Sequence, residues 1–94
     1  MEREVIIRKI IKIIAELLPD QLSESDLIQY ADLIDDLGMD SITFISILVK
    51  IESCFEIIIT DDLLILENFR YVDNIATIVE NELINKEVEG YVKA

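Results

Sequence analysis

Apolar residues recur at the spacing of an α-helix over the first part of the chain. Isoleucines and leucines follow one another there at intervals of three or four positions, and a second line beside the first widens the apolar stripe. The first line consists of Ile6, Ile10, Ile13 and Leu17, and the second of Ile7, Ile11, Ile14 and Leu18. This pattern predicts an amphipathic helix over residues 3–18 that ends near Pro19.

Two later stretches have the same periodicity and predict helices over residues 41–55 and 72–85. Asp73 falls in the first turn of the later helix, where a negative charge suits the helix dipole. The lines that we expect in the core are Ile42, Ile45 and Val49 on the earlier helix and Val72, Ile75 and Val79 on the later one. A further line on the earlier helix consists of Phe44, Leu48, Ile51 and Phe55. Residues 86–94 are polar and predict a frayed tail.

The segments between these helices have weaker signals. Residues 19–36 lack sustained periodicity and are rich in Ser and Asp, which compete with helix formation, so we expect a long connection. Its expected buried anchors are Leu22, Leu27, Ile28 and Ile34. In residues 56–69 an isoleucine run favours a strand, whereas Thr60, Asp61 and Asp62 could cap a short helix. We favour a loop followed by a short helix over residues 62–68.

These elements predict an all-α fold, a small four-helix bundle formed by residues 1–94 as one domain. The long loop then lies between helices one and two, and the third helix is short. The apolar runs near the N-terminus are broken by Arg8, Lys9, Lys12 and Glu16, so they match neither a membrane helix nor a signal peptide.

Charge and composition exclude several functions. The chain carries 20 acidic and 8 basic residues, a formal charge of -12, which opposes nucleic acid binding and favours basic protein partners. It has no histidine, which removes the usual general base and the commonest metal ligand. Cys54 is the single cysteine, so no intramolecular disulfide can form, which fits a cytoplasmic protein. We expect Cys54 to be a small packing residue rather than a thioester carrier.

The densest local signal is the stretch DDLGMDSITF, residues 35–44. Gly38 can take the left-handed backbone that ends the loop, and Asp40 can cap the first free N–H groups of the following helix. Ser41 therefore stands at the start of that helix. On its own, this placement is compatible with a serine that only assists Asp40 in capping.

The longer stretch DDLGMDSITFISILVKIE resembles the phosphopantetheine attachment segment of acyl and peptidyl carrier proteins. In that segment an apolar residue, a glycine, a variable residue and then Asp-Ser-Leu open the second helix. The matching residues are Leu37, Gly38, Asp40 and Ser41, with Ile42 in place of the usual leucine. The resemblance covers residues 3–84. Two positions depart from many fatty acid carriers, which have an acidic residue at Ser46 and a proline at Thr60.

The resemblance implies a carrier and not an enzyme. A phosphopantetheinyl transferase would attach 4'-phosphopantetheine from coenzyme A to Ser41. The arm would hold acyl, aminoacyl or peptidyl intermediates as thioesters. The protein would be a freestanding, monomeric carrier. It would deliver these intermediates to partner enzymes of polyketide, nonribosomal peptide or fatty acid biosynthesis, such as loading enzymes, ketosynthases or condensation enzymes. The alternative is a small acidic interaction module without covalent cargo.

The resemblance also implies that the long loop and the second helix form the docking surface for partner enzymes. The acids that we expect to meet basic partner residues are Asp36, Asp40, Glu52 and Glu56. Glu52 lies about three helical turns after Ser41, at about 3.6 residues per turn, so we expect it to be exposed on the same side of the helix.

Overall fold

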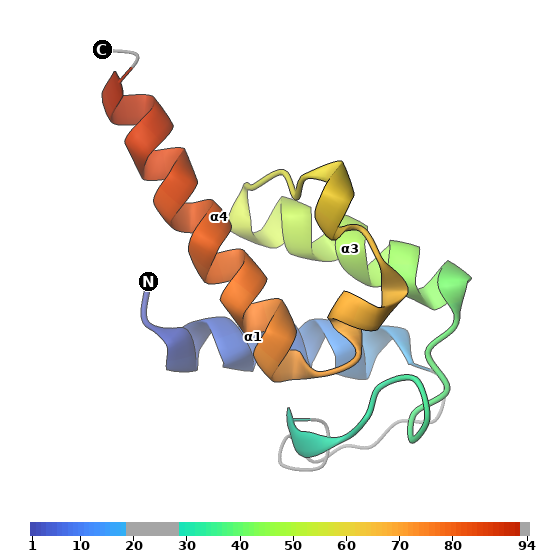
Figure 1. The fold of residues 1–94 in the computed structure, drawn as a ribbon. Helices are drawn as coiled ribbons and strands as arrows, with labels where there is room; N and C mark the ends of the chain where they lie inside the picture. Colours follow the sequence, from blue (N-terminus) through green and yellow to red (C-terminus); the bar gives the residue numbers. More distant parts are fainter. Residues whose placement is uncertain (19–28, 93–94) are drawn as a thin grey trace.

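Three α-helices and two short 3-10 turns make up the fold in a computed structural model that describes residues 1–18 and 29–92. The helices are α1 (Arg3–Leu17), α3 (Ser41–Phe55) and α4 (Val72–Val92), and the turns are η1 (Asp61–Leu63) and η2 (Leu66–Phe69). Helix α1 packs against both α3 and α4, and η2 contacts α3 and α4 (Figure 1). The prediction of an all-α fold is confirmed.

Large apolar side chains from all of these helices meet in one core. The fully buried members include Ile6, Ile10 and Ile14 of α1, Ile47 and Ile51 of α3, Phe69 of η2, and Val72, Ile75 and Val79 of α4. Phe44 and Phe69 pack edge to face, with ring centroids 4.9 Å apart. Burial of each such side chain stabilises the fold by about 1.5–3 kcal/mol before the loss of chain entropy. The predicted core positions on α4 are therefore confirmed, and the apolar stripe of α1 faces the core, with Ile7 and Leu17 only partly buried.

Ion pairs add a second connection between α1 and α4. The Arg3 guanidinium contacts the Asp73 carboxylate at 2.5 Å and also pairs with Glu80. Asp73 is in the first turn of α4, as the sequence predicts. Arg3 thus bridges the first turn of α1 to two positions of α4 that lie about two helical turns apart.

The line of Ile42, Ile45 and Val49 does not lie in the core, contrary to the prediction from the sequence. These side chains are 78%, 56% and 57% exposed. The core is filled instead from the face of α3 that carries Phe44, Ile47, Leu48, Ile51 and Phe55. Helix α3 is apolar on most of its circumference, but α1 and η2 cover only one side of it.

The expected short third helix is also different in the structure, because η1 and η2 take its place. Ile65 between them has extended backbone, with φ -121° and ψ 130°. The N–H of Leu64 donates to the carbonyl of Asp61, whereas the N–H of Asn68 donates to that of Ile65, so two separate turns close. Runs of 3-10 helix longer than three or four residues are uncommon, which fits this division.

Helix α4 is longer than predicted and continues through residues that we expected to fray. It runs to Val92 and extends past the other helices (Figure 1). Residues 81–89 contain no glycine or proline, and Gly90 comes only near the end, so nothing in this stretch breaks the helix. Helix α1 ends at Leu17, close to the predicted end.

Further predictions from the sequence concern Cys54, the buried anchors of the long loop and the lack of a membrane helix. Cys54 is exposed, so the expectation of a packing residue is wrong. Of the expected loop anchors, Ile34 is partly buried, while Leu22, Leu27 and Ile28 lie outside the described residues. Leu33, Leu37 and Met39 provide the buried contacts of this loop instead. None of the described helices is long and apolar enough to cross a membrane.

Candidate functional site

Asp40 caps the start of α3, as the sequence predicts. It has extended backbone, and its Oδ1 accepts a hydrogen bond from the Thr43 N–H at 2.8 Å. Its carbonyl accepts the N–H of Phe44, also at 2.8 Å. The hydrogen bonds from Thr43 hold the pKa of the Asp40 carboxyl below its ordinary value. This carboxylate thus fills the capping position without help from the adjacent serine.

Gly38 has φ +70°, which confirms the predicted left-handed conformation. Its N–H donates to the carbonyl of Ile34 at 3.1 Å, and the N–H of Met39 donates to the carbonyl of Leu33 at 2.9 Å. An added Cβ would meet no heavy atom within 4 Å. The glycine is therefore required by its backbone angle and not by a close neighbour.

Ser41 is the exposed first residue of α3. Among the described residues, no group forms a hydrogen bond with its hydroxyl. The first turn of α3 contains no acidic side chain, so the Asp40 carboxylate at the N-cap is the negative group of this segment that binds the free N–H groups, through Thr43. An exposed hydroxyl at this end of a 15-residue helix fits the attachment of an anionic phosphodiester.

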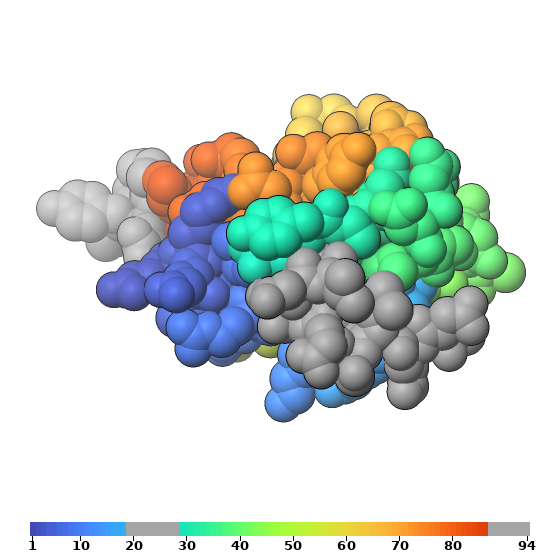
Figure 2. All heavy atoms as spheres, turned by 90° about the horizontal axis from the view of Figure 1, so that it is seen from below, coloured from blue at the N-terminus to red at the C-terminus, as the bar shows by residue number. Residues whose placement is uncertain are grey.

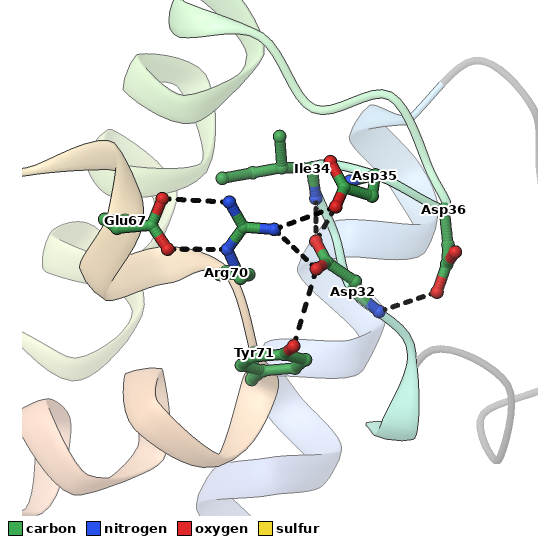
Figure 3. Close-up of polar contacts among 7 residues, drawn as sticks. All are labelled: Asp32, Ile34, Asp35, Asp36, Glu67, Arg70 and Tyr71. Carbon is green, nitrogen blue, oxygen red and sulfur yellow. Dashed lines mark hydrogen bonds and ion pairs between the residues drawn. The ribbon is translucent and has the colours of Figure 1, made fainter.

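The segment before Ser41 is a compact turn anchored by Arg70 (Figure 3). Asp32 Oδ1 accepts the N–H groups of Ile34 and Asp35, at 3.0 and 2.9 Å. Asp32 Oδ2 contacts Nη1 of Arg70 at 2.5 Å, and the N–H of Leu33 donates to the carbonyl of Arg70 at 2.8 Å. In the space-filling view, the segment after residue 29 lies beside α1 and below the start of α4 (Figure 2).

Opposing effects set the pKa values in this cluster. Desolvation acts to raise the pKa of Asp32, but hydrogen bonds from the Asp35 N–H and from Arg70 outweigh it and lower that pKa. The hydrogen bond from Arg70 also lowers the pKa of Glu67. The pKa of Arg70 is raised, chiefly by its hydrogen bond with Glu67 and next by that with Asp32.

This role of Arg70 was not predicted from the sequence. One signal was present, because Arg70 is the only basic residue between Lys50 and Lys86 in an acidic chain. A solitary cation among many carboxylates has a high chance of forming ion pairs within the fold. Its partners Asp32 and Asp35 are 38 and 35 residues away, so the spacing along the chain gives no hint of them.

The predicted docking acids lie at both ends of α3. Asp36 is exposed near the start, and its Oδ2 accepts the Asp32 N–H at 3.0 Å. Glu56 is the exposed C-cap of α3, and its carbonyl accepts Lys86 Nζ at 2.8 Å. Glu52 differs from the prediction, because it is only half-exposed and its Oε2 accepts the Ile59 N–H at 2.9 Å. That carboxylate ties the loop after α3 to the helix.

Comparison with known proteins identifies the class of this fold and site. The family model of the phosphopantetheine attachment site matches residues 8–79. The chain therefore belongs to the phosphopantetheine-binding, acyl carrier protein family. A similar relative is the acyl carrier protein of Desulforapulum autotrophicum (strain ATCC 43914 / DSM 3382 / VKM B-1955 / HRM2). It is 43% identical over 54 residues, which cover 57% of this chain and 69% of the relative. No solved structure matches the chain.

Membership of this family has direct consequences. The prosthetic group of the family is 4'-phosphopantetheine, and its members act as carriers and not as enzymes. Carriers of this family interact with a phosphopantetheinyl transferase and with biosynthetic enzymes.

Proposed function

We propose that Ser41 is the residue to which 4'-phosphopantetheine is attached. The observation that carries the proposal is the exposed Ser41 hydroxyl, which Asp40 leaves free by supplying the N-cap itself. The matched family region includes this position, together with Leu37, Gly38, Asp40 and Ile42 of the motif. The helix N-terminus favours the negative charge that the phosphodiester brings.

The chemistry that follows needs machinery from a partner. The Ser41 oxygen forms a bond to a phosphorus of coenzyme A, and the bond from that phosphorus to the nucleotide part breaks. The proton of the hydroxyl passes to a base of the transferase, which also supplies the magnesium ion. The attached arm then provides a thiol that holds cargo as a thioester. The absence of histidine from this chain fits such a division of labour.

We further propose that partners dock on the solvent side of α3. The exposed side chains of Ile42, Ile45 and Val49 offer apolar contacts, and the acids at the two ends of the helix offer charge for steering basic partners. Those acids are Asp36, Asp40, Glu52 and Glu56. Glu52 contributes less charge to this surface, because its carboxylate binds the backbone of Ile59.

The cargo that we propose is an acyl group or an aminoacyl or peptidyl group, held for polyketide, nonribosomal peptide or fatty acid biosynthesis. The name of the similar relative, acyl carrier protein, supports an acyl cargo. Loading enzymes, ketosynthases or condensation enzymes would be the partners of a monomeric carrier. The absence of a possible intramolecular disulfide is compatible with a cytoplasmic location.

Intact-protein mass spectrometry tests the proposal. The protein is incubated with coenzyme A, magnesium and a broad-specificity phosphopantetheinyl transferase, in parallel with Ser41→Ala and Ser46→Ala. Ser46 is a matched control because it is another exposed serine on α3. We expect one arm on the wild type and on Ser46→Ala, and none on Ser41→Ala. A lack of modification of the wild type by several transferases would favour the alternative, an acidic interaction module without covalent cargo.

A further inference from the structure

We infer that Arg70 is a positioning residue for the modification of Ser41. It acts through the turn formed by residues 32–38, which leads directly to the cap of α3. The inference rests on the proposed function of Ser41. Arg70 belongs neither to α3 nor to the turn before it, because it lies immediately after η2.

The Arg70 guanidinium bridges two segments of the chain (Figure 3). Its Nε and Nη2 contact the two carboxylate oxygens of Glu67 at 2.6 and 2.9 Å, in a bidentate arrangement. Its Nη1 contacts Asp32 at 2.5 Å and Asp35 at 3.2 Å. The side chains of Arg70 and Asp32 are only 22% and 15% exposed, so their ion pair is better shielded from solvent than an ordinary surface pair.

Asp32 transmits this anchor to the backbone of the turn. One carboxylate oxygen binds Arg70, and the other accepts the N–H groups of Ile34 and Asp35. The N–H of Asp32 is held in turn by Oδ2 of Asp36, at 3.0 Å. The main chain of Arg70 contributes as well, through its carbonyl and the N–H of Leu33. Arg70 therefore holds the start of the turn at two points.

The end of the turn is fixed to its start, which connects Arg70 to the serine. The N–H of Met39 returns to the carbonyl of Leu33, and both side chains are buried. Asp40 follows as the N-cap, and Ser41 follows Asp40. Every residue from Gly38 to Asp40 is thus held by a backbone or capping hydrogen bond. A loosened turn would weaken the cap at Asp40 and the first turn of α3, and would so displace Ser41 relative to a transferase docked further along that helix.

Charge explains why one arginine matters here. No Lys or Arg occurs between Ile13 and Val49, so the turn has no cation of its own. The carboxylates that pair with the guanidinium are Asp32, Asp35 and Glu67, and Asp36 lies beyond Asp32, whose N–H it accepts. Without Arg70 these carboxylates repel one another, and Asp32 keeps only the longer hydrogen bond from the Tyr71 hydroxyl, at 3.4 Å, as a side-chain contact to the segment after η2. A lysine would keep a charge but not the planar fork that binds Glu67 and Asp32 together.

The test compares Arg70→Gln and Arg70→Lys with the wild type and with Arg8→Gln. Arg8 is a matched control, since it is exposed and makes one loose ion pair, with Glu4 at 3.7 Å. Amide hydrogen exchange of Leu33 and Met39 is measured in the unmodified protein, and kcat and KM of the transferase are measured on each variant. Circular dichroism confirms that each variant is helical.

We expect Arg70→Gln to accelerate exchange at both amides and to lower kcat by about tenfold, because small misplacements of a reacting group have large effects. Arg70→Lys should lie between Arg70→Gln and the wild type, and Arg8→Gln should match the wild type. The loss should fall mainly on kcat, because the apolar contacts on the solvent side of α3 are unchanged, with a smaller rise in KM because the docking acid Asp36 lies in the turn. A loss confined to KM would instead indicate a docking residue and overturn the inference.

Asp32→Asn provides a second route if Arg70→Gln fails to fold. Asparagine keeps an oxygen acceptor for the turn but removes the ion pair with Arg70, so we expect the same two effects at smaller size. Unchanged exchange and kcat in the folded variants would overturn the inference while Ser41 stays the attachment residue. A wild type that accepts no arm at all would instead refute the proposed function of Ser41, and this inference with it.

Discussion

The two faces of α3 carry the same kind of side chain but have opposite surroundings. Ile47 and Ile51 are fully buried against α1 and the rest of the core, whereas Ile42, Ile45 and Val49 face solvent. All of them belong to one 15-residue helix. Scattered exposed apolar residues are common on proteins, but here three follow one another along a single helix beside Ser41. The difference separates residues that stabilise the fold from residues available to partners.

Ile51→Ala on the buried side of α3 and Ile45→Ala on its solvent side form a matched pair of substitutions. The larger loss of stability is expected for Ile51→Ala. Ile51→Ala leaves a cavity in the core and should lower the free energy of unfolding by about 2–5 kcal/mol. Chemical denaturation followed by circular dichroism measures the effect. A loss below about 1 kcal/mol would show that α3 can collapse onto the cavity and that the contrast between its faces is weak.

Glu52 allows a test at the boundary between the two faces. Glu52→Ala removes the acceptor of the Ile59 N–H and should lower the free energy of unfolding by about 1 kcal/mol. Its effect on transferase kinetics should depend little on salt, unlike that of Glu56→Lys at the exposed C-cap of α3, which we expect to raise KM several-fold at low salt only. A salt-dependent loss of the same size for Glu52→Ala would show that Glu52 steers partners as strongly as the exposed acids and would contradict its smaller contribution to docking.

A substitution on the solvent face of α3 should affect partner binding rather than stability, the opposite of the result expected for Ile51→Ala. Ile45→Ala should change the free energy of unfolding by no more than about 0.5 kcal/mol, as is usual for surface positions. It should raise the KM of a partner enzyme, because the apolar contact is lost. Unfolding measurements and transferase kinetics on the same sample check both statements. A large loss of stability at Ile45 would place this face in the core after all.

The smallest expected effect is a pH dependence at the cap of α3. The pKa of Asp40 is lower in the folded protein, so its ionised form contributes stability that is present above about pH 4 and is lost as pH falls through the folded value. Asp40→Asn keeps a good cap but does not titrate. The difference in stability between the wild type and Asp40→Asn should therefore shrink between about pH 4 and pH 2. A constant difference across this range would contradict the assignment.

The local features of this fold could be predicted from its sequence. The start of α3, the left-handed Gly38 and the capping by Asp40 depend on neighbouring residues alone, and all three are confirmed. The sequence offers two apolar lines on α3, and the line of Phe44, Leu48, Ile51 and Phe55 is the buried one. The choice between the lines could not be predicted, because most of the helix is apolar and its neighbours decide which side they cover. The ion pairs of Arg70 and the bond from Glu52 to Ile59 depend in the same way on segments that only the folded chain brings together.

The central claim is that Ser41 carries the arm, and locating the arm within the modified wild type tests it most directly. Fragmentation of the intact modified protein in a mass spectrometer can distinguish Ser41 from the other exposed nucleophiles of α3, which are Ser46, Ser53 and Cys54. We predict one arm, on the fragment that contains Ser41 and excludes the other three. An arm on Ser46, Ser53 or Cys54, with Ser41 unmodified, would contradict the account.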